Sequence, residues 1–120
     1  MTEQTTPADE LRAAADKLRT LAAAVPPQPW TDDGIGDYGF TVAMGQFGLN
    51  SNGFVLDTRD DSEQGRSLAA YIAVMHPGVG AALAELLDTA AEYLADDAIA
   101  HPTHLVRALA VARKINGGQP

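Results

Sequence analysis

Prolines and glycines divide this chain into segments with different secondary-structure preferences. The sequence Pro26-Pro27-Gln28-Pro29 ends any preceding helix, because proline lacks the backbone donor and restricts the residue before it. Alanine and leucine dominate before this break, whereas glycine and asparagine separate short β-type runs in the range 30–59. The chain is therefore expected to change from helix to strand after residues 26–29.

The segment before the break has the pattern of an amphipathic helix. Thr6 is placed to cap it, Pro7 takes the favoured first position, and Asp9 follows three residues after the cap. An apolar stripe follows at spacings of three and four: Leu11, Ala14, Leu18, Leu21 and Val25. Two arrangements fit this stripe: packing within the helix's own domain, or pairing with another copy in a dimer or tetramer.

Residues 38–59 are predicted to form a small antiparallel sheet. The runs 38–44 (YGFTVAM) and 54–58 (FVLDT) have strand composition, and Asn50-Ser51-Asn52-Gly53 between them favours a turn. Residues 46–49 are a candidate for a further short strand. We expect a β-meander of two to four strands with one face against helices.

The range 62–116 is predicted to form three helices. Asp61 and Gln64 have the capping-box spacing at the start of the first. His-Pro occurs at residues 76–77 and 101–102, and each proline marks the start of a new helix. One apolar face of the middle helix is expected to comprise Val79, Leu83, Leu86, Leu87, Ala90 and Leu94.

Together these segments predict an α+β fold with an N-terminal helix, a small meander and three C-terminal helices that cover the sheet. The 120 residues, 46% of them hydrophobic, suit one domain with a buried core. The predicted single domain, 1–120, comprises a flexible N-terminus (1–6), a helix (7–25), a Pro/Gly linker (26–37), the sheet (38–59) and the helices (62–116).

The formal charge of −8 limits the classes of partner. Phosphates of nucleic acids and anionic lipids would repel such a chain, so neither direct nucleic-acid binding nor membrane binding is expected. Five acids and no base lie between Glu85 and Asp97. This segment is either a solvated acidic face or a decoy that mimics DNA.

The composition also indicates a cytoplasmic protein. There is no cysteine, which excludes disulfides, thiolate nucleophiles and zinc–sulfur sites. The polar N-terminus lacks the basic and apolar regions of a signal peptide, and no apolar run approaches transmembrane length.

Two motif-like segments fail the tests of their chemistry. Residues 34–39 (GIGDYG) match GxGxxG, but a dinucleotide site needs a following helix and a strand is expected there. Residues 57–68 begin like an EF-hand loop, but Arg59, Ser62 and Leu68 stand where an oxygen ligand, glycine and glutamate are needed. A glycine-rich turn and an acidic helix start explain these segments better.

The three histidines, His76, His101 and His104, are the remaining candidates for chemistry. His101 and His104 are three residues apart, and a metal site there would need a carboxylate such as Asp96 or Asp97. His76 lies at a helix corner, where a charged ring would favour the end of the preceding helix. We assign no catalytic residue, cofactor or metal ligand from these patterns, and no enzyme activity is predicted. A small-ligand or metal-binding module stays an alternative.

Two segments resemble the Ead-like small proteins of phages and prophages. Residues 11–18 (LRAAADKL), leading to Pro27-Gln28-Pro29-Trp30, are similar to that family's opening helix and its proline-containing stretch ending in tryptophan. Residues 71–88 (YIAVMHPGVGAALAELLD) resemble its aromatic-Ile-Ala run, proline break and leucine-rich helix. Within them the sequence MHPGV, residues 75–79, is most similar to uncharacterised versions from actinobacteria and their phages. The last helix, from Pro102, departs from the shorter family pattern.

The resemblance implies a non-enzymatic accessory protein in the cytoplasm of a bacterial host. The family's helical segments are linked with oligomer formation, which favours a homo-oligomer through the 11–25 stripe. We expect the chain to act by protein–protein interaction, with a host or phage regulatory protein as the kind of partner. The candidate interaction residues are Leu11, Leu18, Leu21, Glu85, Asp88 and Glu92.

Overall fold

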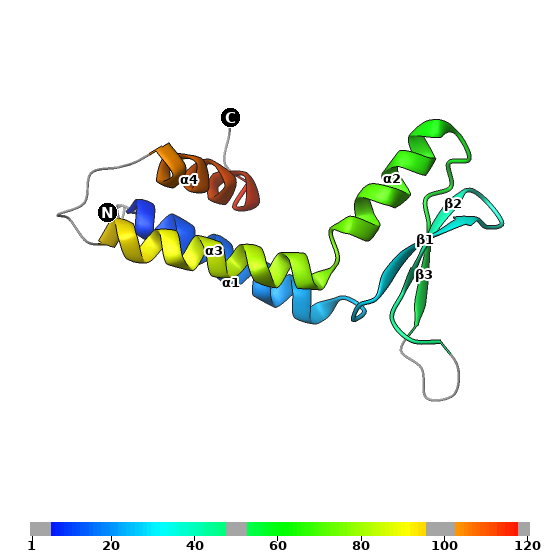
Figure 1. Ribbon diagram of the computed structural model, residues 1–120, viewed down its shortest axis with the longest axis horizontal. Helices are drawn as coiled ribbons and strands as arrows, with labels where there is room; N and C mark the ends of the chain where they lie inside the picture. Colours follow the sequence, from blue (N-terminus) through cyan, green and yellow to red (C-terminus); the bar gives the residue numbers. More distant parts are fainter. Residues whose placement is uncertain (1–5, 48–52, 96–102, 118–120) are drawn as a thin grey trace, which may run out of the picture. The chain divides into compact units, whose positions relative to one another are not determined.

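The computed structural model describes residues 6–47, 53–95 and 103–117 of the chain (Figure 1). In order, its elements are α1 (Pro7–Ala24), β1 (Trp30–Ile35), β2 (Phe40–Met44), β3 (Phe54–Asp57), α2 (Glu63–Val74), α3 (Pro77–Ala95) and α4 (Thr103–Ile115). This order confirms the predicted α+β fold, with an N-terminal helix, a three-stranded antiparallel sheet and helices after it.

Contacts within the chain divide it into two compact units. The helical unit comprises residues 1–21 and 81–120, and the sheet unit comprises residues 22–80. The division falls inside α1 and inside α3. Each unit has its own hydrophobic cluster, and each is described separately below.

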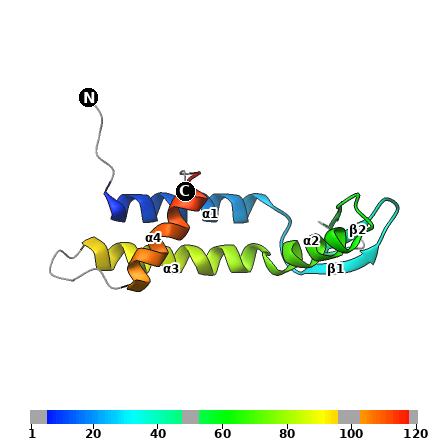
Figure 2. The same ribbon diagram turned by 90° about the horizontal axis from the view of Figure 1, so that it is seen from above.

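The helical unit consists of α1, α3 and α4. Figures 1 and 2 show α1 and α3 side by side, with α4 packed across them. The start of α1 confirms the predicted cap: the Asp9 N–H donates to the Thr6 hydroxyl at 3.1 Å, and the Thr6 N–H donates to the Asp9 carboxylate at 3.5 Å. This reciprocal pair satisfies backbone donors that a helix start leaves without partners.

Alanine makes up most of the core of the helical unit. The buried side chains are Ala8, Leu11, Ala14, Ala15, Ala84, Leu87, Ala90, Ala91, Leu105 and Ala112. Side chains this small let the helix backbones approach closely, while the three leucines supply the bulk. The apolar stripe of α1 is therefore used, at least in its first half, inside its own unit.

Charged contacts at the periphery connect the same three helices. The contacts are the ion pair of Arg19 with Asp88, the ion pair of Arg113 with Glu10 at 3.2 Å, and the hydrogen bond from the Lys17 ammonium to the Ile115 carbonyl at 2.9 Å. Exposed pairs of this kind contribute little to stability, because water and salt screen their charges. They orient the helices, whereas the apolar core supplies most of the stability.

The sheet unit contains three antiparallel strands in the order β1-β2-β3. Val42 of the central strand pairs with Asp32 on one side and with Leu56 on the other. β1 lies within the range predicted as a linker, and its register with β2 shifts between Asp32 and Ile35. It is an edge strand with mostly exposed side chains, so no alternating apolar pattern marks it in the sequence.

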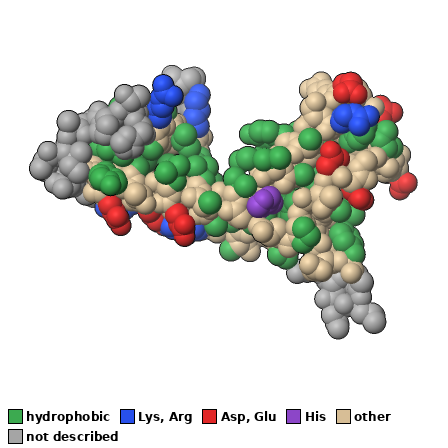
Figure 3. Space-filling model, in the orientation of Figure 1, with side chains coloured by type: hydrophobic (Ala, Val, Ile, Leu, Met, Phe, Trp, Pro, Cys, Tyr) green, Lys and Arg blue, Asp and Glu red, His purple; other side chains and the backbone are tan. Residues whose placement is uncertain are grey.

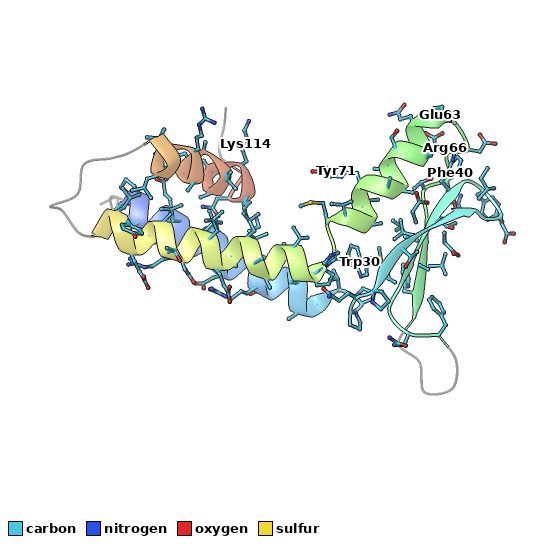
Figure 4. All side chains as sticks on the ribbon, in the orientation of Figure 1. Trp30, Phe40, Glu63, Arg66, Tyr71 and Lys114 are labelled. Atoms are coloured by element: carbon cyan, nitrogen blue, oxygen red, sulfur yellow. The ribbon has the colours of Figure 1, made fainter. Side chains whose placement is uncertain are left out.

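Helix α2 covers one face of this sheet. The buried cluster comprises Phe40, Val42, Met44 and Ala69, with Trp30, Leu56, Ile72 and Ala73 packed against it. The Arg66 guanidinium lies 4.6 Å from the centroid of the Phe40 ring and also pairs with Glu63, as Figure 4 shows. In the same figure Tyr71 points away from the sheet.

Two glycines hold the backbone of Asp60 between the start of β2 and the start of α2. A Cβ atom on Gly39 would lie 2.2 Å from the Asp60 nitrogen, and one on Gly65 would lie 1.9 Å from the Asp60 carbonyl oxygen. The Phe40 N–H donates to that carbonyl at 3.2 Å. Only glycine fits at either position, because any side chain would overlap the backbone.

The start of α2 differs by one residue from the predicted capping box of Asp61 and Gln64. Ser62 is the N-cap, and its hydroxyl accepts from the Gly65 N–H at 3.5 Å. The Asp60 carboxylate in turn accepts hydrogen bonds from the hydroxyl and the backbone N–H of Ser62. These bonds lower the pKa of Asp60 below its ordinary value of 3.8.

Substitution of Gly65 by alanine should destabilise the sheet unit. In an unobstructed helix this change stabilises by about 1 kcal/mol, but here the overlap with Asp60 should cost about 1–3 kcal/mol or more. The fluorescence of Trp30, the only tryptophan, reports unfolding of this unit in denaturant. The matched control is Gly80→Ala in α3, where the nearest atom is 3.7 Å away and a small stabilisation is expected. Equal effects of the two substitutions would contradict the overlap.

The Asp60→Asn variant should show the contribution of the Asp60 carboxylate as a function of pH. Because folding lowers the pKa of this group, its stabilisation is present above the unfolded-state pKa and is lost as the pH falls through the folded-state pKa. The variant should therefore unfold at lower denaturant concentration than the natural protein at pH 7. The difference should shrink below pH 3.8. A difference that is constant with pH would exclude the ionised carboxylate as the cause.

Candidate protein-binding groove

Helices α3 and α4 form an apolar groove on the helical unit. Its volume is about 290 Å³. The lining residues are Leu86, Thr89, Ala90 and Tyr93 of α3, and Leu105, Arg107, Ala108 and Val111 of α4. On each helix these residues recur at spacings of three and four, so the groove lies between one face of α3 and one face of α4.

Small and large side chains alternate along the groove, so its surface has both hollows and protrusions. Ala90, which is buried, and Ala108 contribute only methyl groups to the lining. Beside them Leu86 and Tyr93 are 60% and 50% exposed. Large apolar side chains gathered around a hollow are typical of a surface that another molecule covers.

The α4 margin of the groove is basic. Arg107 belongs to the lining, and Lys114 follows it by seven residues, two helical turns, near the end of α4 (Figure 4). Neither forms an ion pair with the residues that the structure describes. In Figure 3 hydrophobic side chains are exposed on this unit, with Lys and Arg side chains on one side of them and both acidic and basic side chains on the other.

The α3 margin is acidic. Glu85 and Glu92 are exposed, and each directly precedes a groove-lining residue. The hydrogen bond to Asp88 is the main cause that raises the pKa of Arg19. The negative charge of Glu85 adds to this effect. Within the described ranges, neither glutamate side chain forms an ion pair, although the Glu85 backbone carbonyl accepts a hydrogen bond from the Thr89 hydroxyl at 3.0 Å. Asp88 differs from them because it pairs with Arg19.

The three candidate leucines of α1 have different environments. Leu11 is fully buried in the core of the helical unit, so it contributes to no surface of that unit. Leu18 is half-buried against the same core, and Leu21 is exposed. The predicted stripe therefore packs against its own unit at one end and reaches solvent at the other.

The acidic segment is divided in a similar way. Of the candidates, Glu85 and Glu92 are exposed, whereas Asp88 is partly buried and paired with Arg19. Asp96 and Asp97 lie outside the described residues. The decoy alternative stays a prediction. Because Asp88 pairs with Arg19, one carboxylate fewer is free to mimic a DNA phosphate.

His76 has a local structural role. Its Nδ1 accepts a hydrogen bond from the Gly78 N–H at 3.1 Å, and α3 begins at Pro77 as predicted. The imidazole thus caps the following helix, whereas we expected it to favour the end of the preceding one. The side chains of His101 and His104 lie outside the described part of the chain.

Other candidate sites are occupied by structural contacts. Residues 34–39 comprise the end of β1 and the turn to β2, where the Gly36 N–H donates to the Gly39 carbonyl at 2.8 Å and a strand follows. The Asp57 carboxylate accepts from the backbone N–H of Tyr38 and of Arg59. Within residues 6–47, 53–95 and 103–117, no group of three or more His, Asp or Glu could hold a metal ion.

The described helices differ from membrane-spanning helices in length or in apolar character. None of them alone has both the length and the apolar character needed to cross a membrane. Only α2 and α3, counted together as one bent pair, pass the test of length and composition.

Sequence reasoning missed the groove because it placed Leu86 on the inward face of its helix. Leu86, Ala90 and Tyr93 follow one another at spacings of four and three, which is the signal of a second apolar face on α3. In a helix this rich in alanine and leucine, the sequence pattern does not distinguish two adjacent apolar faces from one broad face. Only the position of α4 separates the face that is covered from the face that is open.

Comparison with protein-family models, with curated proteins and with solved structures finds no match to this chain.

Proposed function

We propose that this chain is a non-enzymatic accessory protein that acts by binding a protein chain in the groove between α3 and α4. The observation that carries the proposal is the apolar hollow of about 290 Å³ beside the exposed side chains of Leu86 and Tyr93. Burial of apolar surface stabilises a complex by about 25 cal/mol per Å² before the costs of association. The resemblance to Ead-like phage and prophage proteins supports an accessory role in a bacterial cytoplasm.

A helix is the partner element that best suits this geometry. A groove between two helices accepts an amphipathic helix whose side chains at positions i, i+3 or i+4, and i+7 enter it. Arg107 is the polar member of the lining that can donate hydrogen bonds to that helix. The Thr89 hydroxyl already donates to the Glu85 carbonyl, so Thr89 can only accept a hydrogen bond from it. Leu86 and Tyr93 would become the central buried contacts, since large side chains dominate the energy of such interfaces.

Site-specific photo-cross-linking in the cells that produce the protein tests this function. A photoreactive residue at position 86 should give one discrete cross-linked species, because a bound chain would cover the groove. The same residue at position 13, which is exposed on α1, should give little or none. Mass spectrometry then identifies the cross-linked chain. Cross-links of equal yield at both positions, or none at position 86, would reject the groove as a binding surface.

A further inference from the structure

We propose that the chain bound in the groove is a second copy of this protein, in a two-fold dimer with α3 of each copy packed against α4 of the other. This inference rests on the proposed function of the groove as a protein-binding surface. The shape and the charge of the groove both support it. They concern the α3–α4 surface and are separate from the apolar stripe of α1.

The groove is complementary in shape to its own rim. One surface carries both the protruding side chains of Leu86 and Tyr93 and the hollow beside Ala90 and Ala108. An engineered apolar cavity of about 150 Å³ binds benzene, so the hollow of about 290 Å³ has room for one or two side chains of this size. In a two-fold dimer each copy supplies both the protrusion and the hollow, as an isologous interface requires.

The charges at the two margins specify which helices face each other. Glu85 and Glu92 are seven residues apart on α3, and Arg107 and Lys114 are seven residues apart on α4. Both pairs therefore span about 10 Å along their helices. When α3 of one copy lies against α4 of the other, acids face bases along both contacts of the dimer. When α3 faces α3, acids face acids, and this arrangement is disfavoured.

The pattern of ion pairs inside the unit supports the same conclusion. Arg19 with Asp88 and Arg113 with Glu10 are satisfied within one copy. Among the described residues of α3 and α4, the charges without an ion pair include the four that flank the groove, two acidic and two basic. A second copy provides an opposite charge for each of them.

Charge-reversal variants test the dimer, with molar mass measured by size-exclusion chromatography and light scattering. The purified natural chain should have the mass of a dimer. The double variants Glu85→Lys with Glu92→Lys, and Arg107→Glu with Lys114→Glu, should each weaken self-association by about tenfold or more, because like charges then face each other. Mixing the two variants should restore a dimer that contains one copy of each, since opposite charges face again.

The control is Asp33→Lys with Asp37→Lys, two exposed residues of the sheet unit that change the net charge as the first double variant does. This control should remain dimeric, and circular dichroism should show the same helix content for every variant. A natural chain that is monomeric at high micromolar concentration would overturn the dimer, as would variants that fail to complement each other. If position 86 then cross-links to a different protein, the proposed function stands and only the self-association fails.

Discussion

Close packing of alanine against alanine is the interaction on which the helical unit depends. Seven of the ten buried core residues that the structure describes there are alanine, and Leu11, Leu87 and Leu105 are the rest. Such a core brings backbones together but has little surface with which to cover large apolar side chains on the neighbouring helix face. Leu86 and Tyr93 therefore remain exposed beside Ala90, and the groove follows from the composition of the core.

The sheet unit depends on a different constraint, the close approach of backbones at Asp60. Gly39 and Gly65 leave room for that approach, and the Phe40 N–H uses the Asp60 carbonyl as its acceptor. The carboxylate of the same residue orients Ser62, which caps α2. One residue thus connects the first residue of β2 with the first turn of α2, and the helix lies over Phe40, Val42 and Met44 as a consequence.

The charged residues fall into two groups with different uses. Those paired across helices, such as Arg19 with Asp88, define the arrangement of α1, α3 and α4. Those beside the groove have no such partner among the described residues, and they are arranged with one sign on each margin. An apolar surface gives affinity but little orientation, whereas charges of opposite sign on its two margins give orientation. This combination is the reason that we propose an interaction, and a self-complementary one, for α3 and α4.

The sequence by itself determined the features that local chemistry controls. Thr6 and Pro7 mark the start of α1, Pro77 marks the start of α3, and the change of composition after Pro29 marks the change from helix to strand. The tertiary structure decided what depends on distant neighbours. β1 exists because β2 pairs with it, although its own residues have no strand pattern, and Leu86 is exposed because α4 covers a different face of α3. Capping and helix termination act within a few residues, whereas strand pairing and burial join segments far apart in the chain, so only the folded chain reveals them.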